Sequence, residues 1–156
     1  MFGGGQERGI SPGTQPVALI AGFGKAAELC CNEWANDLKH DRRIKEILMD
    51  GLKGSGLSFQ INGSQEKSMP SCLNVCFEGV SSEALMIAVK KRLSISNGSA
   101  CTSGSYEPSY VLLAMGFDRA RAESSIRISW GRMLNEDDAA EGFAELVDAA
   151  MGLQKG

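Results

Sequence analysis

The sequence predicts one small α+β domain in which helices cover a short sheet. Apolar residues recur at helical spacing in some segments and alternate with polar residues in others. These segments follow in the order helix, strand, strand, helix, strand, helix, strand, helix, which is typical of a layered α+β structure. The chain of 156 residues, 43% of them hydrophobic and 22% charged, is also long and apolar enough to bury one core.

The N-terminal third is predicted to be a loop followed by two helices. Residues 2–14 are rich in glycine, which favours a loop. Apolar residues then recur at helical spacing over residues 16–34, with Pro16 in the first turn, where a missing backbone N–H removes no helical hydrogen bond. A second helix is predicted at residues 42–52, and the Gly-Ser-Gly sequence at residues 54–56 ends it.

The middle of the chain is predicted to hold two strands, a helix and a third, shorter strand. Residues 57–61 and residues 72–77 both alternate apolar with polar side chains, and a proline and a glycine bound the second run. A helix over residues 82–93 begins after a serine that can cap it. Residues 94–96 then form a short strand.

The C-terminal third is predicted to contain a helix, a strand and a final helix. The first helix begins at residues 107–108, Glu-Pro, and Gly116 closes it. Residues 125–130 alternate as a strand does. The sequence Asn-Glu-Asp-Asp at residues 135–138 caps the last helix, since its acids suit the positive end of the helix dipole.

Charge and hydropathy exclude two classes of partner. The formal net charge is −3 and no run of Lys or Arg forms a stripe, so we expect no direct binding to nucleic acid. The longest apolar runs, such as residues 17–21 and 111–115, are far shorter than the about 20 residues that a membrane-spanning helix needs. The N-terminus also has no charged segment followed by an apolar one. We therefore expect a cytoplasmic protein that does not enter a membrane.

The cysteines are expected to be reduced thiols. There are five, and their spacing fits no zinc or iron–sulfur ligand pattern; they are Cys30, Cys31, Cys72, Cys76 and Cys101. Cys72 and Cys76 share one face of a predicted strand but lie about 13 Å apart at the rise of a strand. That separation is too long for a disulfide. We interpret four cysteines as structural and one as reactive.

Cys101 is the candidate nucleophile because of the segment that carries it. Its neighbours between residues 97 and 105 are all small or polar, so no apolar side chain next to Cys101 draws it into a core. Gly98 and Gly104 permit a mobile loop, and a nearby helix N-terminus or cation would lower the pKa of the thiol. The alternative is a surface loop with an incidental cysteine, and the residues alone leave both interpretations open.

Arg127 is the candidate binding residue. It stands between Ile126 and Ile128 in a predicted strand, so the two isoleucines face one side and Arg127 the other. An arginine in this position either makes a surface ion pair or binds a substrate carboxylate with two parallel hydrogen bonds. His40, the one histidine, stands among charged residues and is expected to be solvated, which leaves Cys101 without a histidine partner.

Three blocks of the sequence together resemble the cysteine desulfurases. The first is GGGQERGISPGT at residues 3–14, which resembles the GGGxERGxRxGT segment of that family and by itself is a weak phosphate-binding signal. The second is SNGSACTS at residues 96–103 with EPSYVL at residues 107–112, which resembles the catalytic cysteine loop. The third is SSIRISWGR at residues 124–132, which resembles the SSIRxSxGR strand. The blocks have the family's order and spacing and span nearly the whole chain.

The resemblance implies a fold-type I transferase that depends on pyridoxal 5'-phosphate (PLP), is a homodimer, and has this chain as its small C-terminal domain with a short, mostly antiparallel sheet. Its substrate would be L-cysteine, whose sulfur passes to Cys101 as a persulfide and leaves alanine. Arg127 matches the residue that binds the substrate carboxylate, and Thr14 the residue that reaches the partner subunit's cofactor phosphate. A sulfur-acceptor protein is also implied, for iron–sulfur clusters, tRNA thiolation or DNA phosphorothioation. The family leaves open iron–sulfur ligation by Cys101; no other metal ligand is expected.

The chain departs from the family in two respects. Ser11 and Pro12 stand where the family has an arginine and a small residue, which alters the loop before Thr14. The lysine, histidine and aspartate that hold PLP in the family precede the first block, and no matching motif is present here. We therefore expect residues 1–15 to be an arm of the large domain and residues 16–156 to be the small domain with its connecting helix. We also expect the 156-residue chain to be inactive alone.

Two other hypotheses remain. The chain could be a non-catalytic sulfur-relay or partner-binding module that accepts a persulfide on Cys101 from another enzyme, which its intact cysteine loop and apolar core favour. It could also be a remnant that does not fold without a large domain, in which case an exposed apolar patch would lead to aggregation.

Overall fold

The structure is a computed structural model that describes residues 2–98 and 107–154, and its contacts divide the chain into two units, residues 1–36 and 37–156. The two units are described separately below. The elements in chain order are η1 (Gln6–Gly9), α1 (Val17–Gly54), β1 (Phe59–Ile61), β2 (Cys72–Phe77), α2 (Ser82–Val89), α3 (Tyr110–Ala114), α4 (Arg119–Glu123), β3 (Ser125–Ser129) and α5 (Glu136–Gln154).

The first unit contains the glycine-rich segment and the N-terminal half of α1. The predicted loop contains one turn of 3-10 helix, η1, in which Glu7 and Arg8 have positive φ angles of 47° and 56°. The Gln6 side chain closes the loop, since its Oε1 accepts a hydrogen bond of 3.1 Å from the backbone nitrogen of Gly13. Gly13 has a φ of 125°, a conformation that a residue with a Cβ rarely adopts.

The prediction of two helices in the N-terminal third is wrong, because α1 is one continuous helix from Val17 to Gly54. The residues between the two predicted helices interrupt the apolar pattern but include neither proline nor glycine, so nothing in the backbone stops the helix there. The predicted end is confirmed. Ser55 Oγ donates a hydrogen bond of 2.7 Å to the carbonyl of Leu52, and Gly56 follows with a φ of 73°.

The second unit is built on a three-stranded antiparallel sheet in the order β1-β2-β3, which confirms the predicted α+β fold with its antiparallel sheet. Strand β2 matches its predicted range, and β3 ends one residue earlier than predicted. The first predicted strand shortens to Phe59–Ile61. The strand predicted at residues 94–96 reduces to a single bridge between Ser96 and Arg127.

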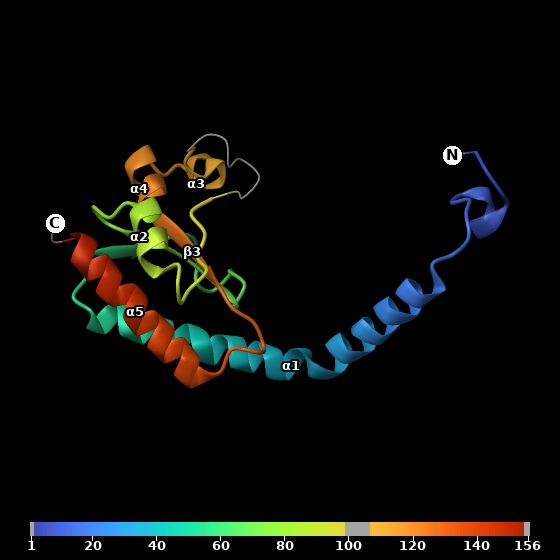
Figure 1. Cartoon of the computed structure of the whole chain (residues 1–156), viewed down its shortest axis with the longest axis horizontal. Helices are drawn as coiled ribbons and strands as arrows, with labels where there is room; N and C mark the ends of the chain where they lie inside the picture. Colours follow the sequence, from blue (N-terminus) through green and yellow to red (C-terminus); the bar gives the residue numbers. More distant parts are fainter. Residues whose placement is uncertain (1, 99–106, 155–156) are drawn as a thin grey trace. The chain divides into compact units, whose positions relative to one another are not determined.

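One face of the sheet carries the core. Leu73, Val75 and Phe77 of β2 lie on this face beside Ile126 and Ile128 of β3, and all five are buried. The core also contains residues of α1, α2 and α5, among them Ile44, Leu48, Leu52, Leu85, Val89, Phe143 and Leu146. Figure 1 shows α5 along the C-terminal part of α1, with the strands and α2 beside them. The other face of the sheet is therefore left for polar side chains.

Short helices α3 and α4 lie between residue 107 and β3. Helix α3 is shorter than predicted, and Gly116 with a φ of 87° ends its last turn as expected. Helix α4 was not predicted because its five residues are too few to show a period. Asp118 caps it, since its Oδ1 accepts a hydrogen bond of 2.7 Å from the backbone nitrogen of Arg121.

No helix in the described part of the chain is long and apolar enough to cross a membrane.

Candidate functional site

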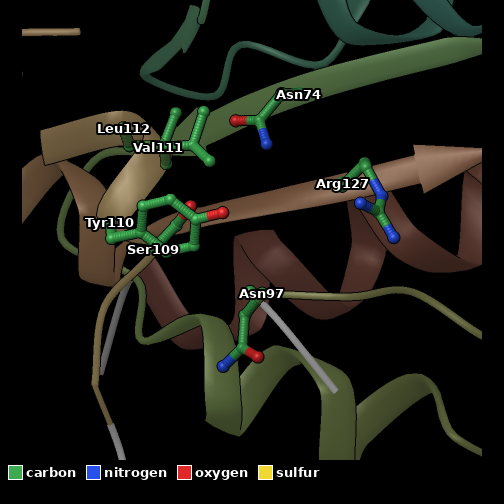
Figure 2. Close-up of a pocket in the computed structure, with 8 residues that line it drawn as sticks. Asn74, Asn97, Ser109, Tyr110, Val111, Leu112 and Arg127 are labelled. Carbon is green, nitrogen blue, oxygen red and sulfur yellow. The ribbon is translucent and has the colours of Figure 1, made fainter. Parts of the chain in front are cut away.

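The polar face of the sheet forms one wall of a cavity of about 320 Å³. Asn74 of β2 and Arg127 of β3 contribute this wall, Asn97 and Gly98 come from the segment after α2, and Ser109 with the start of α3 encloses the remaining side. Figure 2 shows Ser109 and Tyr110 on one side of this cavity, Arg127 on the other, and Asn74 and Asn97 between them. The lining residues are Asn74, Asn97, Gly98, Ser109, Tyr110, Val111, Leu112 and Arg127.

Arg127 reaches this cavity because of the alternation in β3. Ile126 and Ile128 are buried in the core, whereas Arg127 points to the opposite face and is exposed, as the sequence predicts. Within residues 2–98 and 107–154, no side chain forms a hydrogen bond or ion pair with the Arg127 guanidinium. The described residues thus supply no carboxylate for a surface ion pair, and the guanidinium is available to an anionic ligand.

Cys101 lies outside the described residues, so the structure does not place it. The ends of the chain on either side of it are described, however. Gly98 before the segment and Ser109 after it both line the cavity. The chain therefore leaves and re-enters the described structure at the edge of the cavity that contains Arg127.

A partly buried polar network that sequence reasoning missed runs from α4 to the cavity. Arg121 Nε donates a hydrogen bond of 2.7 Å to Asn62 Oδ1. Asn62 Nδ2 in turn donates to Asn74 Oδ1 at 2.7 Å and to Ser125 Oγ at 2.8 Å. For Asn74 a signal was present in the sequence, because it stands between Leu73 and Val75 and so shares the face of Arg127. Asn62 and Arg121 are distant from it in sequence and gave none.

The described cysteines are all free thiols. Cys30 and Cys31 are exposed, Cys72 is half-buried and Cys76 is buried. Burial raises the pKa of the Cys76 thiol, and the hydrogen bond to Ser125 offsets only part of this effect. Cys76 therefore has low thiolate content and the properties of a structural cysteine.

Thr14 and His40 are not part of the cavity. Thr14 is exposed in the first unit, directly after Gly13. The prediction that His40 is solvated is wrong, since its Nε2 is buried and has no hydrogen-bond partner among the described residues. The error arose because Trp130 packs next to this turn of α1, where its Nε1 donates to the carbonyl of Asp41 at 3.1 Å.

The described lining of the cavity offers hydrogen-bond donors that suit an anion. None of its described lining residues is a lysine, so no amine is present to form a Schiff base. The described residues also contain no group of three or more His, Cys, Asp or Glu that could hold a metal ion. The wall instead offers a guanidinium, amides and hydroxyl groups, which suit a small polar carboxylate.

Comparison with protein families and curated proteins identifies relatives over almost the whole chain. The profile of the family described as aminotransferase class-V matches residues 5–141. The cysteine desulfurase IscS of Neisseria meningitidis serogroup A is 43% identical over 97% of this chain. The mitochondrial cysteine desulfurase of Saccharomyces cerevisiae is 47% identical over 88% of it. The chain spans 37% of the first relative and 27% of the second.

Solved structures give the same result for the fold. A structure described as a NifS-like protein covers 98% of the chain with a TM-score of 0.80 and 29% identity, and the chain spans 39% of it. A second structure, described as SspA in complex with cysteine, covers 83% of the chain with a TM-score of 0.55 and 32% identity, and the chain spans 34% of it.

Proposed function

The chain belongs to the aminotransferase class-V family, and from this premise we propose that it is the C-terminal part of a cysteine desulfurase that receives the sulfur of L-cysteine on Cys101. The observation that supports this most is the position of Arg127. Its guanidinium, unpaired among the described residues, lines a cavity whose edge includes the residues on both sides of the Cys101 segment. A reaction on the sulfur of an α-amino acid requires a group that binds the carboxylate and a thiol that can reach the sulfur.

Arg127 binds the carboxylate of L-cysteine in this proposal. A guanidinium presents parallel N–H donors that match the two carboxylate oxygens, and such pairs fix orientation as well as adding affinity. Fixing the carboxylate also fixes the direction of the substrate side chain. The substrate sulfur can then be held toward the segment that carries Cys101.

The sulfur transfer conserves all atoms. The Cys101 thiolate attacks the substrate sulfur, an S–S bond forms, and the bond between the substrate sulfur and its β-carbon breaks. The products are L-alanine, which gains the proton, and a persulfide on Cys101. The family depends on PLP, which supplies the electron sink for such chemistry when it is bound. Because the described lining residues include no lysine, this chain is not proposed to hold PLP covalently, and Thr14 is proposed only to contact its phosphate across a homodimer.

The sulfur acceptor and the cellular compartment are also proposed from the family to which the chain belongs. The persulfide passes to a sulfur-acceptor protein, with iron–sulfur cluster assembly as one destination, and the protein acts in the cytoplasm. The named relatives include a mitochondrial one, so an organelle remains an alternative compartment. Iron–sulfur ligation by Cys101 stays a hypothesis from family analogy.

The first experiment measures alanine and persulfide in two forms of the protein. One is the 156-residue chain with added PLP and L-cysteine, and the other is a chimaera in which the chain replaces the matching C-terminal part of the Neisseria relative. We expect no alanine from the chain alone and alanine from the chimaera, with mass spectrometry locating the extra sulfur on Cys101. Alanine from the chain alone would disprove its inactivity.

Two cysteine variants test the role of Cys101 in the chimaera. Cys101→Ser should abolish the persulfide and reduce alanine formation at least about a hundredfold, since a hydroxyl cannot replace the thiolate. Cys72→Ser is the matched control and should change neither. Equal labelling of the two variants would contradict the proposal. Labelling of Cys101 in the isolated chain by a separate, active desulfurase would instead favour the relay module.

A further inference from the structure

The polar network of Arg121, Asn62 and Asn74, with Asn62 buried at its centre, sets the direction of one amide in the cavity. We propose that Asn74 is a specificity-determining residue that donates a second hydrogen bond, beside Arg127, to the carboxylate of the ligand, and that Asn62 and Arg121 are positioning residues that hold its amide in the required orientation. This inference rests on the proposed function for the identity of the ligand, but it concerns carboxylates in general.

The network begins at Arg121, whose guanidinium is fixed on three sides. It lies over the ring of Phe117, 4.0 Å from the ring centre. It also donates to the side chain of Gln60 and to the carbonyl of Ile61. A guanidinium has donors only, so the group that it meets on Asn62 must be an acceptor. The Asn62 oxygen therefore faces Arg121, and the amide nitrogen faces the opposite way.

Asn62 passes this orientation on to Asn74. Its side chain is buried, with 7% exposed, so reversing its amide would place N–H groups against the guanidinium without water to satisfy them. In the observed orientation Asn62 Nδ2 donates to Asn74 Oδ1 at 2.7 Å. The backbone supports the pair, since Asn62 N donates to the Asn74 carbonyl at 2.9 Å.

The consequence is that Asn74 presents a donor to the cavity. Its Oδ1 is taken by Asn62, which leaves Nδ2 for a ligand, and Figure 2 shows this nitrogen directed into the cavity. Among the residues that the structure describes, none accepts a hydrogen bond from Asn74 Nδ2. With the opposite orientation an oxygen would face the ligand and would repel a carboxylate.

Asn74 and Arg127 are close enough to share one ligand group. They are direct partners in the register of β2 and β3. Directly opposed residues on one face of an antiparallel pair have Cβ atoms about 4.5–5.5 Å apart. A carboxylate can accept from both, because its two oxygens offer about four acceptor positions. Two donors on adjacent strands favour a carboxylate over an amide or an alcohol of the same size.

The test is a titration of the full chain with propionate, a carboxylate without a thiol or amine. Nuclear magnetic resonance follows the side-chain amide of Asn74 and the Nε–H of Arg127. Both signals should shift with one Kd. Asn74→Ala should raise this Kd about tenfold, because it removes a hydrogen bond to a charged group. Absence of a shift at Asn74 would overturn the proposal.

Asn62→Asp separates positioning from structure. The new carboxylate keeps the Arg121 contact but has no N–H for Asn74 Oδ1, so the Asn74 amide turns over to donate to it. We expect Kd for propionate to rise about tenfold or more, although residue 62 does not line the cavity. Gln60→Ala is the control for a general disturbance of the network, because it removes one Arg121 contact but leaves the hydrogen bond from Asn62 to Asn74 intact, and it should not change Kd.

The result also separates this inference from the proposed function. Suppose that propionate binding to the chain depends on Asn74 but the chimaera never places sulfur on Cys101. This result would support the inference and refute the proposed function. Sulfur transfer to Cys101 with the same propionate Kd in wild type, Asn74→Ala and Asn62→Asp would do the reverse. If Asn62→Asp fails to fold, as its backbone amide spectrum would show, Asn74→Ala decides, because Asn74 is only half-buried.

Discussion

At the scale of single residues, the carboxyl group of Asp41 on α1 is partly buried in a way that disfavours its charged form. Its Oδ1 is buried and has no hydrogen-bond partner among the described residues. Burial raises the pKa of Asp41 above its ordinary value of 3.8; nearby His40 lowers it and Asp37 raises it by smaller amounts. The folded state therefore holds the Asp41 proton more tightly than the unfolded state does.

This pKa shift gives a prediction with a definite sign. Below pH 3.8 Asp41 is protonated in both states and has no effect on stability. As the pH rises above that value, the folded state binds more protons than the unfolded state, so the free energy of unfolding falls. Asp41→Asn should thus raise Tm at neutral pH and lose the gain in acid below that value. The exposed Asp50 is the control, and thermal unfolding that responds alike to Asp41→Asn and Asp50→Asn would contradict the explanation.

The polar network shows how one residue acquires a role through others. Asn74 could be placed on the face of Arg127 from the sequence, because both follow the strand alternation. The direction of its amide could not, since it depends on Asn62, which follows β1, and on Arg121 in α4. A hydrogen-bond relay of this kind has no periodic signal.

At the scale of elements, the ends of the helices were easier to predict than their continuity. The predicted caps at Ser81 and Asn135 are local, since each side chain accepts a hydrogen bond from a backbone nitrogen three residues later. The continuity of α1 was not predicted, because polar residues between the two predicted helices break the apolar pattern, although none of them is a proline or glycine that would stop the helix.

The cap of α5 provides a test at this scale. Asn135 Oδ1 accepts a hydrogen bond of 2.7 Å from the backbone nitrogen of Asp138, and Asn135 Nδ2 donates to the Asp138 carboxylate at 2.7 Å. Asn135→Ala should lower the free energy of unfolding by about 1 kcal/mol. Asn135→Asp should lower it much less, because an aspartate at residue 135 still accepts the capping hydrogen bond. Chemical denaturation measures both. An equal loss in the two variants would show that the acceptor is not what matters.

At the scale of the whole molecule, the buried core belongs to the second unit. All of its buried apolar residues lie between Ile44 and Ala150. The N-terminal half of α1 instead exposes large apolar side chains, including Val17, Leu19, Ile20, Phe23 and Trp34. Exposed apolar side chains in such number on one helix raise the tendency to associate.

Deletion of residues 1–36 tests this division. The remaining unit should keep its cooperative unfolding transition, because it retains the sheet and every buried apolar residue of the core, and Asp37 can cap the shortened helix. Size-exclusion chromatography should also show less self-association than the full chain does. Loss of the transition on deletion would show that the first unit is needed for folding.

Leu48→Ala in the full chain tests the contribution of the second unit, as the deletion tests that of the first. Leu48 is fully buried in the core of the second unit, so its truncation should lower the free energy of unfolding by about 2–5 kcal/mol. Chemical denaturation of the variant beside the unaltered chain measures the difference. A smaller loss for Leu48→Ala than for the deletion would place the main source of stability in the first unit.

The division into residues 1–15 and 16–156 stays a prediction, whereas the predicted fold class and the resemblance to the cysteine desulfurases are confirmed. Local pattern was sufficient for the strands at 72–77 and 125–129, because side-chain alternation is set by the backbone alone. It was not sufficient for α4 or for the burial of His40 Nε2, since these depend on what packs nearby.

The sequence by itself determined which family this chain resembles, which residues alternate onto the core, and that Arg127 points away from the two isoleucines beside it. Only the tertiary structure decided what stands around Arg127. The register of β2 and β3 places Asn74 opposite it, and the Asn97 segment and α3 close the cavity around both. The physical reason is that alternation is a property of neighbours along the chain, whereas a binding site is made by residues distant in sequence that packing brings together.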